Sequence, residues 1–312
     1  MMRLSRPLLV ATLVGFVLLP LHLVGCGDGG GDAPSATDVA PSDLGEADGA
    51  SGPAPAITGE PRGACAVGDV TGLFEIVYGK NFSYFSGDVN AFPTPAAPPE
   101  ELLATGACTV RRQVQLACSS PCEGGTVCGT EGSCVDAPGS QGVGTVSVLG
   151  LLKEVSLEPT EGTGFYMESS LPHPPFEPGA AVQLDATGGD DAAFTLYGVG
   201  VDKVEVLDAS WTVTAGQPLW VSWTPDDQSD ADVEVVLAID QLGKSPAEIV
   251  CVTEDTGALE IAADLIDLLL ESGTSGEPAG TVTRRTVDSD MIDRGCVELR
   301  VYGSVLVPVN LP

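Results

Sequence analysis

The sequence predicts a mainly β protein, with a disulfide-knotted N-terminal β region followed by an immunoglobulin-like antiparallel β-sandwich that carries one short helix. Three observations support this fold class. Short runs of alternating apolar and polar residues recur between clusters of Gly, Pro and Asp, a spacing typical of sandwiches and barrels. Cysteines are numerous, and only one segment has helical periodicity. The folded part is longer than one typical domain, so we expect two domains.

The first 25 residues have the layout of an export signal. Arg3 and Arg6 precede an apolar run from Leu8 to Val24, as a charged n-region precedes a hydrophobic h-region. This run is about 17 residues long, shorter than the roughly 20 that a membrane-spanning helix needs, and Pro20 interrupts it. We therefore expect residues 1–25 to be a signal peptide rather than a transmembrane anchor.

The residues Leu-Val-Gly-Cys at the end of this leader resemble the lipobox of bacterial lipoproteins, whose cysteine receives acyl chains such as palmitate. The resemblance covers the first 26 residues and identifies Cys26 as the lipidation site. Such proteins carry two or three acyl chains, and because one chain alone binds a membrane only marginally, this attachment would be permanent. Gly27 replaces the aspartate that commonly retains these lipoproteins in the inner membrane, which favours the outer membrane.

Residues 26–60 are expected to form a lipidated, disordered tether. From Gly27 to about Glu60 the chain is rich in Gly, Ala, Pro, Ser and acidic residues and has no Lys, Arg or aromatic residue, so it has little apolar surface to offset the entropy of ordering. A flexible chain of this length reaches about 30–35 Å. Without its leader the chain has 11 basic and 44 acidic residues, a formal charge of −33, which excludes nucleic acid as a natural partner.

Nine alternating runs are expected to form strands. They begin at Leu73, Gly144, Glu154, Ala181, Lys203, Leu219, Val233, Ala247 and Cys296. The Pro-rich segment 169–179 is expected to link a β region of residues 61–168 to the sandwich of residues 180–312, since its prolines disfavour helix and central strand. Within the sandwich, apolar residues at near-helical spacing followed by Gly273 predict one short helix in EIAADLIDLLLESG.

Eight cysteines remain beside Cys26, and an even number in an exported chain predicts four disulfides, although 105 pairings are possible. They are Cys65, Cys108, Cys118, Cys122, Cys128, Cys134, Cys251 and Cys296. Residues 118–134 have too little apolar content for a core, so we expect a small knot held by crosslinks. A zinc site is the alternative, which the absence of C-x2-C pairs disfavours. We expect the six cysteines up to Cys134 to pair among themselves, and Cys251 to pair with Cys296.

Alternation also assigns side chains to faces. In CVELRV, three apolar residues share one face, whereas Cys296, Glu298 and Arg300 share the other. In LWVSWT, Trp223 is expected in the core and Trp220 on the opposite face. Trp220 is a candidate for stacking on a sugar, and an aromatic covered by a loop or an interdomain contact is the alternative.

Two acidic loops are candidate calcium sites, because Ca²⁺ takes six to eight oxygen ligands. The first contains Asp226, Asp227, Asp230 and Asp232, and the second contains Asp288, Asp290 and Asp293. Neither matches the EF-hand order, and solvated acidic turns are the alternative interpretation.

No catalytic motif stands out. Beyond the leader the chain has one histidine, His173, between two prolines, and it lacks G-x-S-x-G, phosphate-loop and H-E-x-x-H patterns. We therefore predict no enzyme, but a lipid-anchored cell-envelope protein that acts as a non-enzymatic binding or structural module. The membrane, through Cys26, and an unknown envelope or extracellular ligand are the expected partners. The alternatives are a calcium-stabilised adhesion or carbohydrate-binding domain, or a carboxylate-dependent envelope hydrolase.

Together, the cysteine-rich run, VGTVSVLGL, PGAAVQLDATGGDDAAF and LWVSWTPDD with AEIVCVTEDTGALEI resemble a family of outer-membrane lipoproteins abundant in predatory Gram-negative soil bacteria. Those proteins share a lipobox, a low-complexity tether, a cysteine knot and a sandwich-like C-terminal region. They have Trp at the position of Trp223 and Cys at that of Cys251. The resemblance implies location and fold, and no established activity.

Overall fold

The computed structural model describes residues 57–189, 191–239, 246–276 and 278–311. The predicted signal peptide, the lipidation site Cys26 and the tether up to residue 56 lie outside these residues. No helix in the described ranges is both long and apolar enough to cross a membrane.

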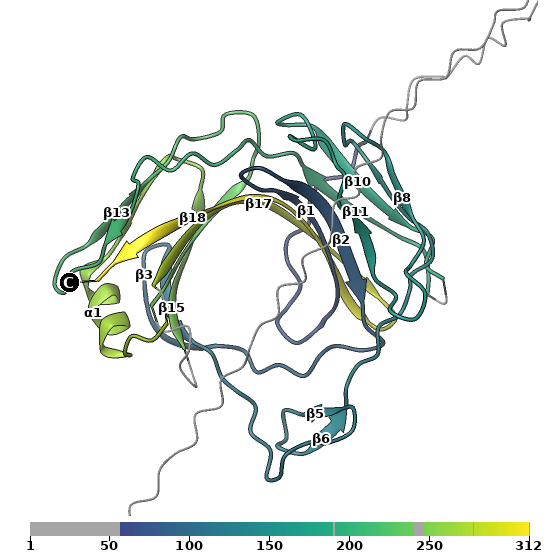
Figure 1. Cartoon of the computed structure of the whole chain (residues 1–312), viewed down its shortest axis with the longest axis horizontal. Helices are drawn as coiled ribbons and strands as arrows, with labels where there is room; N and C mark the ends of the chain where they lie inside the picture. Colours follow the sequence, from purple (N-terminus) through teal and green to yellow (C-terminus); the bar gives the residue numbers. More distant parts are fainter. Residues whose placement is uncertain (1–56, 190, 240–245, 277, 312) are drawn as a thin grey trace, which may run out of the picture. The chain divides into compact units, whose positions relative to one another are not determined.

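A ten-stranded sheet dominates the structure, in the order β3-β4-β15-β14-β17-β18-β1-β2-β9, with β12 also paired to β18. Its strands are β1 (Val70–Tyr78), β2 (Ser83–Val89), β3 (Glu100–Thr105), β4 (Cys108–Arg112), β9 (Tyr166–Glu168), β12 (Trp211–Thr212), β14 (Asp232–Ala238), β15 (Ala247–Glu254), β17 (Ala279–Ile292) and β18 (Gly295–Asn310). Among the described strands, only two pairs are parallel: β18 with β1, and β18 with β12. The sheet is strongly curved (Figure 1).

Smaller elements cover the convex side of this sheet (Figure 1). One is a four-stranded sheet, in the order β11-β10-β7-β8, and another is the pair β13-β16. Their bounds are β7 (Val146–Leu149), β8 (Val155–Leu157), β10 (Ala181–Ala186), β11 (Phe194–Val199), β13 (Leu219–Ser222) and β16 (Ala258–Ile261). The helix α1 (Ala263–Glu271) follows β16, and its Leu265, Ile266 and Leu269 are buried. The predicted helix is therefore confirmed, and it ends before Gly273, whose φ of 99° suits glycine.

Two hydrophobic cores lie between these layers. The first packs β1, β2 and the first half of β18 against the four-stranded sheet, and it includes Phe74, Phe85, Leu184, Leu196 and Leu299. The second packs β4, β14, β15 and the second half of β18 against β13, β16 and α1, and it includes Val110, Val235, Ile249, Val221 and Leu265. Because β18 is 16 residues long, its alternating apolar residues serve both cores.

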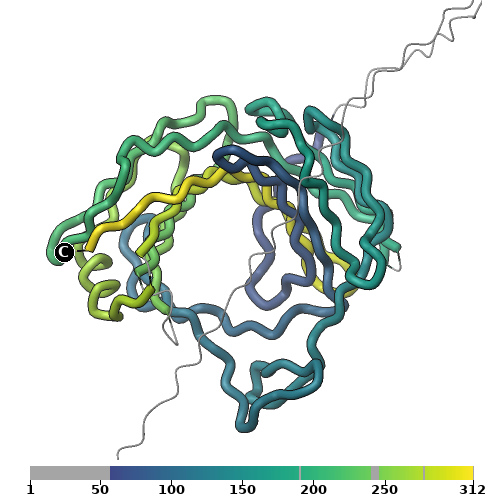
Figure 2. Tube along the Cα trace, viewed as in Figure 1, coloured from purple at the N-terminus to yellow at the C-terminus, as the bar shows by residue number. Residues whose placement is uncertain are grey.

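The mainly β class is thus confirmed, with packed β layers, several disulfides and a single helix among the described residues. The predicted division into residues 61–168 and 180–312 is wrong. Strands from both ranges alternate within the large sheet, where β1 pairs with β18 and β4 with β15, and the described residues from 57 onward belong to one compact unit. Figure 2 shows early and late chain segments side by side in this sheet. Segment 169–179 is no linker between separate domains, because Leu171 and Phe176 are buried in the first core.

The strand predicted at Lys203 forms only in part. Residues of this run appear as the two-residue β12 and as a single bridge between Val206 and Trp223. The backbone between them instead bonds to the end of β13, where Leu207 N donates to Ser222 O at 2.9 Å.

Four disulfides join cysteines of the described ranges, and two of their pairings correct the prediction. Cys65 is bonded to Cys296, and Cys108 to Cys251, so both bridges join the early and late parts of the chain. The predicted Cys251–Cys296 bridge is wrong because these residues lie on β15 and β18, which are separated in the sheet by β14 and β17. The bridges Cys118–Cys128 and Cys122–Cys134 are local and crosslink the hairpin of β5 (Thr126–Cys128) and β6 (Cys134–Asp136), which confirms the expected knot.

A buried ion pair joins the layers in the middle of β17. Arg284 is 1% exposed, and its Nε donates to Asp255 Oδ2 at 2.6 Å. Its other nitrogens donate to the backbone oxygens of Asp202, Lys203 and Thr224. Asp255 also accepts a hydrogen bond from Trp223 Nε1 at 2.6 Å. Each of the three guanidinium nitrogens therefore donates at least one hydrogen bond, which offsets the cost of burying the charge.

Candidate functional site

The large sheet has one face packed on the cores and another on the inside of its curve, which we name the concave face (Figure 1). On β18 the core receives Val297 and Leu299, whereas Glu298 and Arg300 lie on the concave face, as the sequence predicts. The same alternation on neighbouring strands gathers further polar residues there. The polar residues of the concave face include Glu75, Asp88, Arg111, Glu234, Glu248, Arg285, Glu298, Arg300 and Tyr302.

Three ion pairs cross this face, each between one arginine and one glutamate. They are Arg111–Glu248 at 2.9 Å, Arg285–Glu234 at 2.9 Å and Arg300–Glu298 at 2.6 Å. The three guanidinium side chains are between 24% and 36% exposed, so solvent reaches them. Each guanidinium has five N–H donors and uses one or two in its pair, which leaves donors available to water or to a ligand.

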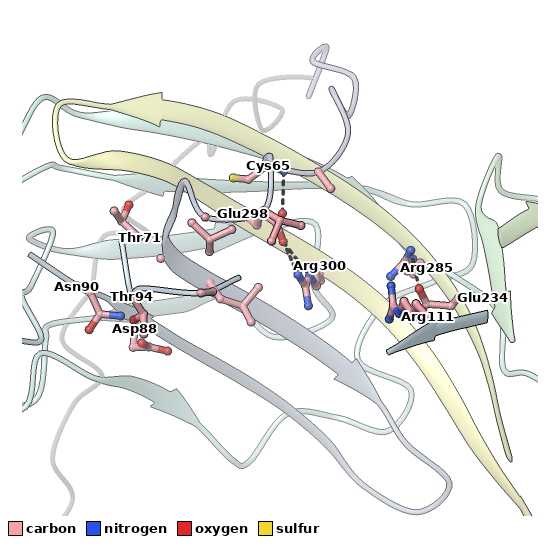
Figure 3. Close-up of a pocket in the computed structure, with 17 residues that line it drawn as sticks. Cys65, Thr71, Asp88, Asn90, Thr94, Arg111, Glu234, Arg285, Glu298 and Arg300 are labelled. Atoms are coloured by element: carbon pink, nitrogen blue, oxygen red, sulfur yellow. Dashed lines mark hydrogen bonds and ion pairs between the residues drawn. The ribbon is translucent and has the colours of Figure 1, made fainter. Parts of the chain in front are cut away.

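A cavity of about 550 Å³ opens on the concave face (Figure 3). It is lined by all three of these arginines, by Glu234 and Glu298, and by Thr71, Asp88, Asn90 and Thr94. The close-up shows Arg111 and Arg285 on one side of Arg300, and the smaller polar residues Thr71, Asp88, Asn90 and Thr94 on the other side. Burial raises the pKa of Asp88. Donors and acceptors of both charge signs therefore face one space.

Tyr302 extends this polar surface toward β2. Its phenol hydrogen-bonds with Glu75 and Tyr84, and desolvation by burial, followed by the charge of Glu75, raises its pKa far above the ordinary value. Tyr302 therefore stays a neutral hydroxyl at all physiological pH values, with its orientation set by two partners.

The first described residues are fastened across the sheet beside the cavity. The bridge Cys65–Cys296 attaches them to β18, and Cys65 N donates to Glu298 Oε1 at 2.7 Å. Arg62 Nε pairs at 2.8 Å with Asp288 Oδ1, whose side chain is fully buried. This hydrogen bond is the main reason that the pKa of Arg62 is raised. We name residues 57–69 the N-terminal strap, part of which lines the cavity.

The predicted calcium ligands after β13 are not assembled around one point. Asp226 is buried, and its carboxylate accepts hydrogen bonds from Gln228 N, Ser229 Oγ and Asp202 N. Burial alone would raise the pKa of Asp226, but these hydrogen bonds, with Arg284, lower it. Asp227, Asp230 and Asp232 are exposed. In the described ranges, no three of these carboxylates bring ligand atoms within 4.8 Å of one another.

The second acidic group is divided in the same way. Asp288 is buried and accepts hydrogen bonds from Arg62 and from Tyr197 N, Asp290 pairs with Arg62 at 3.3 Å, and Asp293 lies in the turn between β17 and β18. Calcium binding by either loop remains a prediction.

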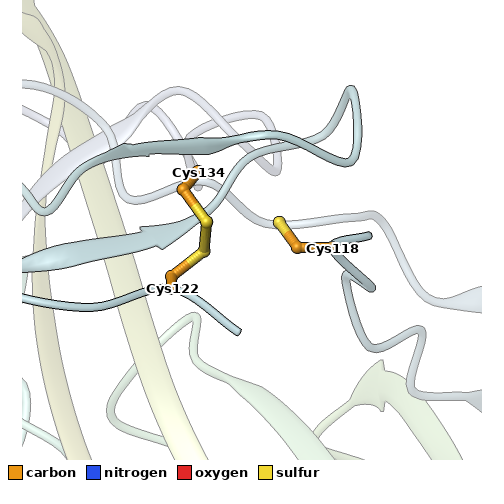
Figure 4. Close-up of side chains that lie close together, drawn as sticks. All are labelled: Cys118, Cys122 and Cys134. Carbon is orange, nitrogen blue, oxygen red and sulfur yellow. A yellow bond between two sulfur atoms is a disulfide. The ribbon is translucent and has the colours of Figure 1, made fainter. Parts of the chain in front are cut away.

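One cluster of potential metal ligands occurs among the described residues, in the knot. The Sγ atoms of Cys118, Cys122 and Cys134 lie within 4.8 Å of one another (Figure 4). All three are in disulfides, with Cys128 as the fourth partner. Because metal ligation by cysteine requires a thiolate, the oxidised knot has no zinc ligands to offer.

The two tryptophans of β13 and its extension lie as predicted. Trp223 is 1% exposed in the second core, and Trp220 is 59% exposed. Trp220 does not line the concave cavity, so sugar stacking on this residue would be a separate site and remains a prediction. His173 hydrogen-bonds through Nδ1 with Ser83 Oγ at 2.9 Å, but Ser83 is only 4% exposed.

Sequence reasoning missed most of the concave cluster. It placed Glu298 and Arg300 on one face of their strand, but it did not connect them with Arg111, Glu234 or Arg285. The available signal was the phase of alternation in VTRRTVDSD, where Arg285 points opposite to Arg284. These segments alone do not determine which strands are neighbours in the sheet.

Comparisons with known proteins add little. No protein-family model matches the chain, and no curated protein matches it in sequence. Among solved structures, the FN1–FN3 domains of chicken CNTN1 align over 73% of this chain and 78% of that chain, at 8% identity and a TM-score of 0.20. A TM-score this low does not define a shared fold, so we infer neither topology nor function from it.

Proposed function

We propose that the protein is a lipid-anchored, non-enzymatic binding module of the cell envelope and that its ligand occupies the concave face. The observation that carries the proposal is the convergence of Arg111, Arg285 and Arg300 on one cavity. They are three of only seven arginines between residues 57 and 312 of a chain with a formal charge of −31. Scattered surface pairs would place these residues apart, whereas the pairing of five adjacent strands, from β4 to β18, gathers them.

The balance of charge favours a neutral ligand rich in hydroxyl groups, such as a glycan. The three arginines face Glu234, Glu298 and Asp88 in the cavity, so neither a polyanion nor a polycation finds an unopposed surface. A hydroxyl group can accept from a guanidinium and donate to the neighbouring carboxylate. Hydrogen bonds to charged groups each contribute about 1.5–3 kcal/mol.

Attachment to the envelope is supported by the lipobox at Cys26 and the tether that follows. A Cys26→Ser chain should lose incorporation of an alkynyl fatty acid and move from the membrane fraction to the soluble fraction. Retention in the membrane without acylation would refute the anchor.

Two adjacent arginines of β4 provide a matched test of the ligand site. Arg111 lies on the concave face, whereas Arg112 pairs with the exposed Glu100 at 3.5 Å. The full-length protein in detergent would be applied to an array of neutral, amino-sugar and uronic-acid hexasaccharides. We expect binding of neutral glycans that weakens about tenfold in Arg111→Gln and is unchanged in Arg112→Gln.

Salt separates the ligand classes in the same assay. Binding of a neutral glycan should vary little between low and physiological salt, whereas a polyanion would be released. Absence of binding to every glycan on the array would refute the glycan site. So would an equal loss of binding in Arg111→Gln and Arg112→Gln.

A further inference from the structure

An open edge of β18 carries a second inference, independent of the concave face. Along this edge β18 pairs with β1 as far as Gly303 and with β12 from Val309. Between these partners, residues 304–308 have no neighbouring strand on this edge in the part of the chain that the structure describes. At about 3.3 Å per residue, the gap in the sheet is about 17 Å long.

The backbone of Leu306 points into this gap. On the β1 side, Cys296 N donates to Asp69 O at 2.8 Å, and on the β12 side, Asn310 O accepts from Val213 N at 3.0 Å. Alternate residues of a strand direct their N–H and C=O groups to the same edge. Leu306 is an even number of residues from both Cys296 and Asn310, so its donor and acceptor face the gap. An exposed strand edge of this kind is the template on which an extended peptide adds.

A groove of about 750 Å³ lies against this edge. Large apolar side chains on three different segments are exposed there: Phe82 by 55%, Leu207 by 68% and Leu306 by 68%. Exposed apolar side chains gathered in one groove, rather than scattered singly, mark interaction surfaces.

The charge around this groove is opposite to that of the protein. Lys80 and Lys203 line it, with Glu205 as the carboxylate beside them. The whole chain has only four lysines and a formal charge of −31. Two of its rare basic groups therefore flank the exposed apolar residues, and this favours an acidic partner.

We propose that this β18 edge groove binds an extended peptide of a partner protein, with apolar residues at alternate positions and acidic residues between them. Alternate side chains of a strand point to opposite faces, so the apolar set would contact the exposed Phe82, Leu207 and Leu306 and the acidic set would meet Lys80 and Lys203. An anionic membrane would use the same side chains but would not need the backbone N–H of Leu306. The open strand edge favours the peptide.

The test uses a fluorescein-labelled peptide, acetyl-Asp-Val-Asp-Val-Asp-Val-amide, and the full chain with Cys26→Ser, so that an anchor does not affect the readout. Fluorescence anisotropy should show saturable binding. Leu306→Pro removes the N–H that faces the gap, a change tolerated at open edges, and should weaken binding at least tenfold. Leu306→Ala keeps this N–H and loses only the side-chain contact, so it should weaken binding clearly less than Leu306→Pro does.

Two further measurements distinguish a peptide from an anionic membrane as the ligand of the groove. The double variant Lys80→Glu with Lys203→Glu should weaken peptide binding about tenfold, and Leu152→Glu, at an exposed leucine elsewhere, should not. Thermal melting would confirm that each variant is folded, and an unfolded Leu306→Pro would be replaced by a peptide N-methylated at alternate residues. Absence of saturable binding, or equal binding by all variants, would overturn the proposal. So would binding to phosphatidylglycerol vesicles, but not to the peptide, that the lysine substitutions abolish.

Discussion

Removing the bridge between Cys65 and Cys296 should destabilise the whole fold, whereas removing the bridge between Cys118 and Cys128 should not. The first bridge joins residues 231 positions apart and holds the N-terminal strap on β18, the strand shared by both cores. The second joins residues 10 positions apart in a hairpin that pairs with no other strand among those described.

The expected magnitude follows from the chain entropy that each bridge removes from the unfolded state. With Cys108–Cys251 intact, the loop closed by Cys65–Cys296 shrinks to about 90 residues, which corresponds to about 4–5 kcal/mol. This is about a quarter or more of the stability of a typical domain, about 5–15 kcal/mol. The short loop of the knot corresponds to about 3 kcal/mol, but this stabilisation is confined to the hairpin.

Urea unfolding followed by tryptophan fluorescence would compare the paired alanine variants, because Trp211 and Trp223 are buried beside the large sheet. The Cys65→Ala/Cys296→Ala variant should unfold at clearly lower urea. Cys118→Ala/Cys128→Ala should match the parent transition while its knot becomes sensitive to protease. Equal midpoints for the two variants would refute the reasoning, and peptide mapping without reductant would check the pairings directly.

Three further predictions concern single side chains. Asp255→Ala should cost about 3–5 kcal/mol because it leaves the buried Arg284 without its partner, and a urea midpoint equal to the parent's would contradict this role. The pKa of Glu168 is lowered to about 2, mainly by its hydrogen bond from Lys153. Since this folded-state pKa is below the unfolded value, the stabilisation is complete above pH 4.5 and is lost as the pH falls toward 2. Glu168→Gln should reduce the fall in melting temperature between pH 4.5 and 2. A melting temperature that falls as steeply as in the parent would contradict this role of Glu168. Acrylamide should quench the exposed Trp220, so Trp220→Phe should remove most of the quenchable emission; if quenching persists, one of the two buried tryptophans is accessible.

Local patterns predicted the individual elements better than their arrangement. The alternation of Leu73–Tyr78 and the helical spacing before Gly273 correspond to β1 and α1, because each element buries a single apolar face. The long strand β17 was not predicted, because Arg284, Thr286 and Asp288 occupy its core-facing positions. These residues are buried only because partners elsewhere in the chain satisfy them, and a local pattern carries no information about such partners.

The disulfides and the site were missed for a related reason. The sequence predicts a disulfide between Cys251 and Cys296 because both follow the proline-rich segment. In the structure, each is bonded to a cysteine more than a hundred positions away. The three ion pairs of the concave cluster likewise need five strands in the correct order. A prediction from sequence favours disulfides and clusters between residues that are close along the chain. In the folded protein, the order of strands in the sheet decides which side chains share a face.

The position of the N-terminal strap connects the anchor with the ligand site. If Cys26 is acylated as proposed, any tension from the membrane enters the fold at Arg62 and Cys65, both of which are fastened to β17 and β18. Cys65 also donates to Glu298, the carboxylate that orients Arg300 in the cavity. Beyond the ion pair of Arg62, a covalent bond rather than the edge of a core would therefore bear the load, at the same residue whose backbone N–H donates to the ligand site.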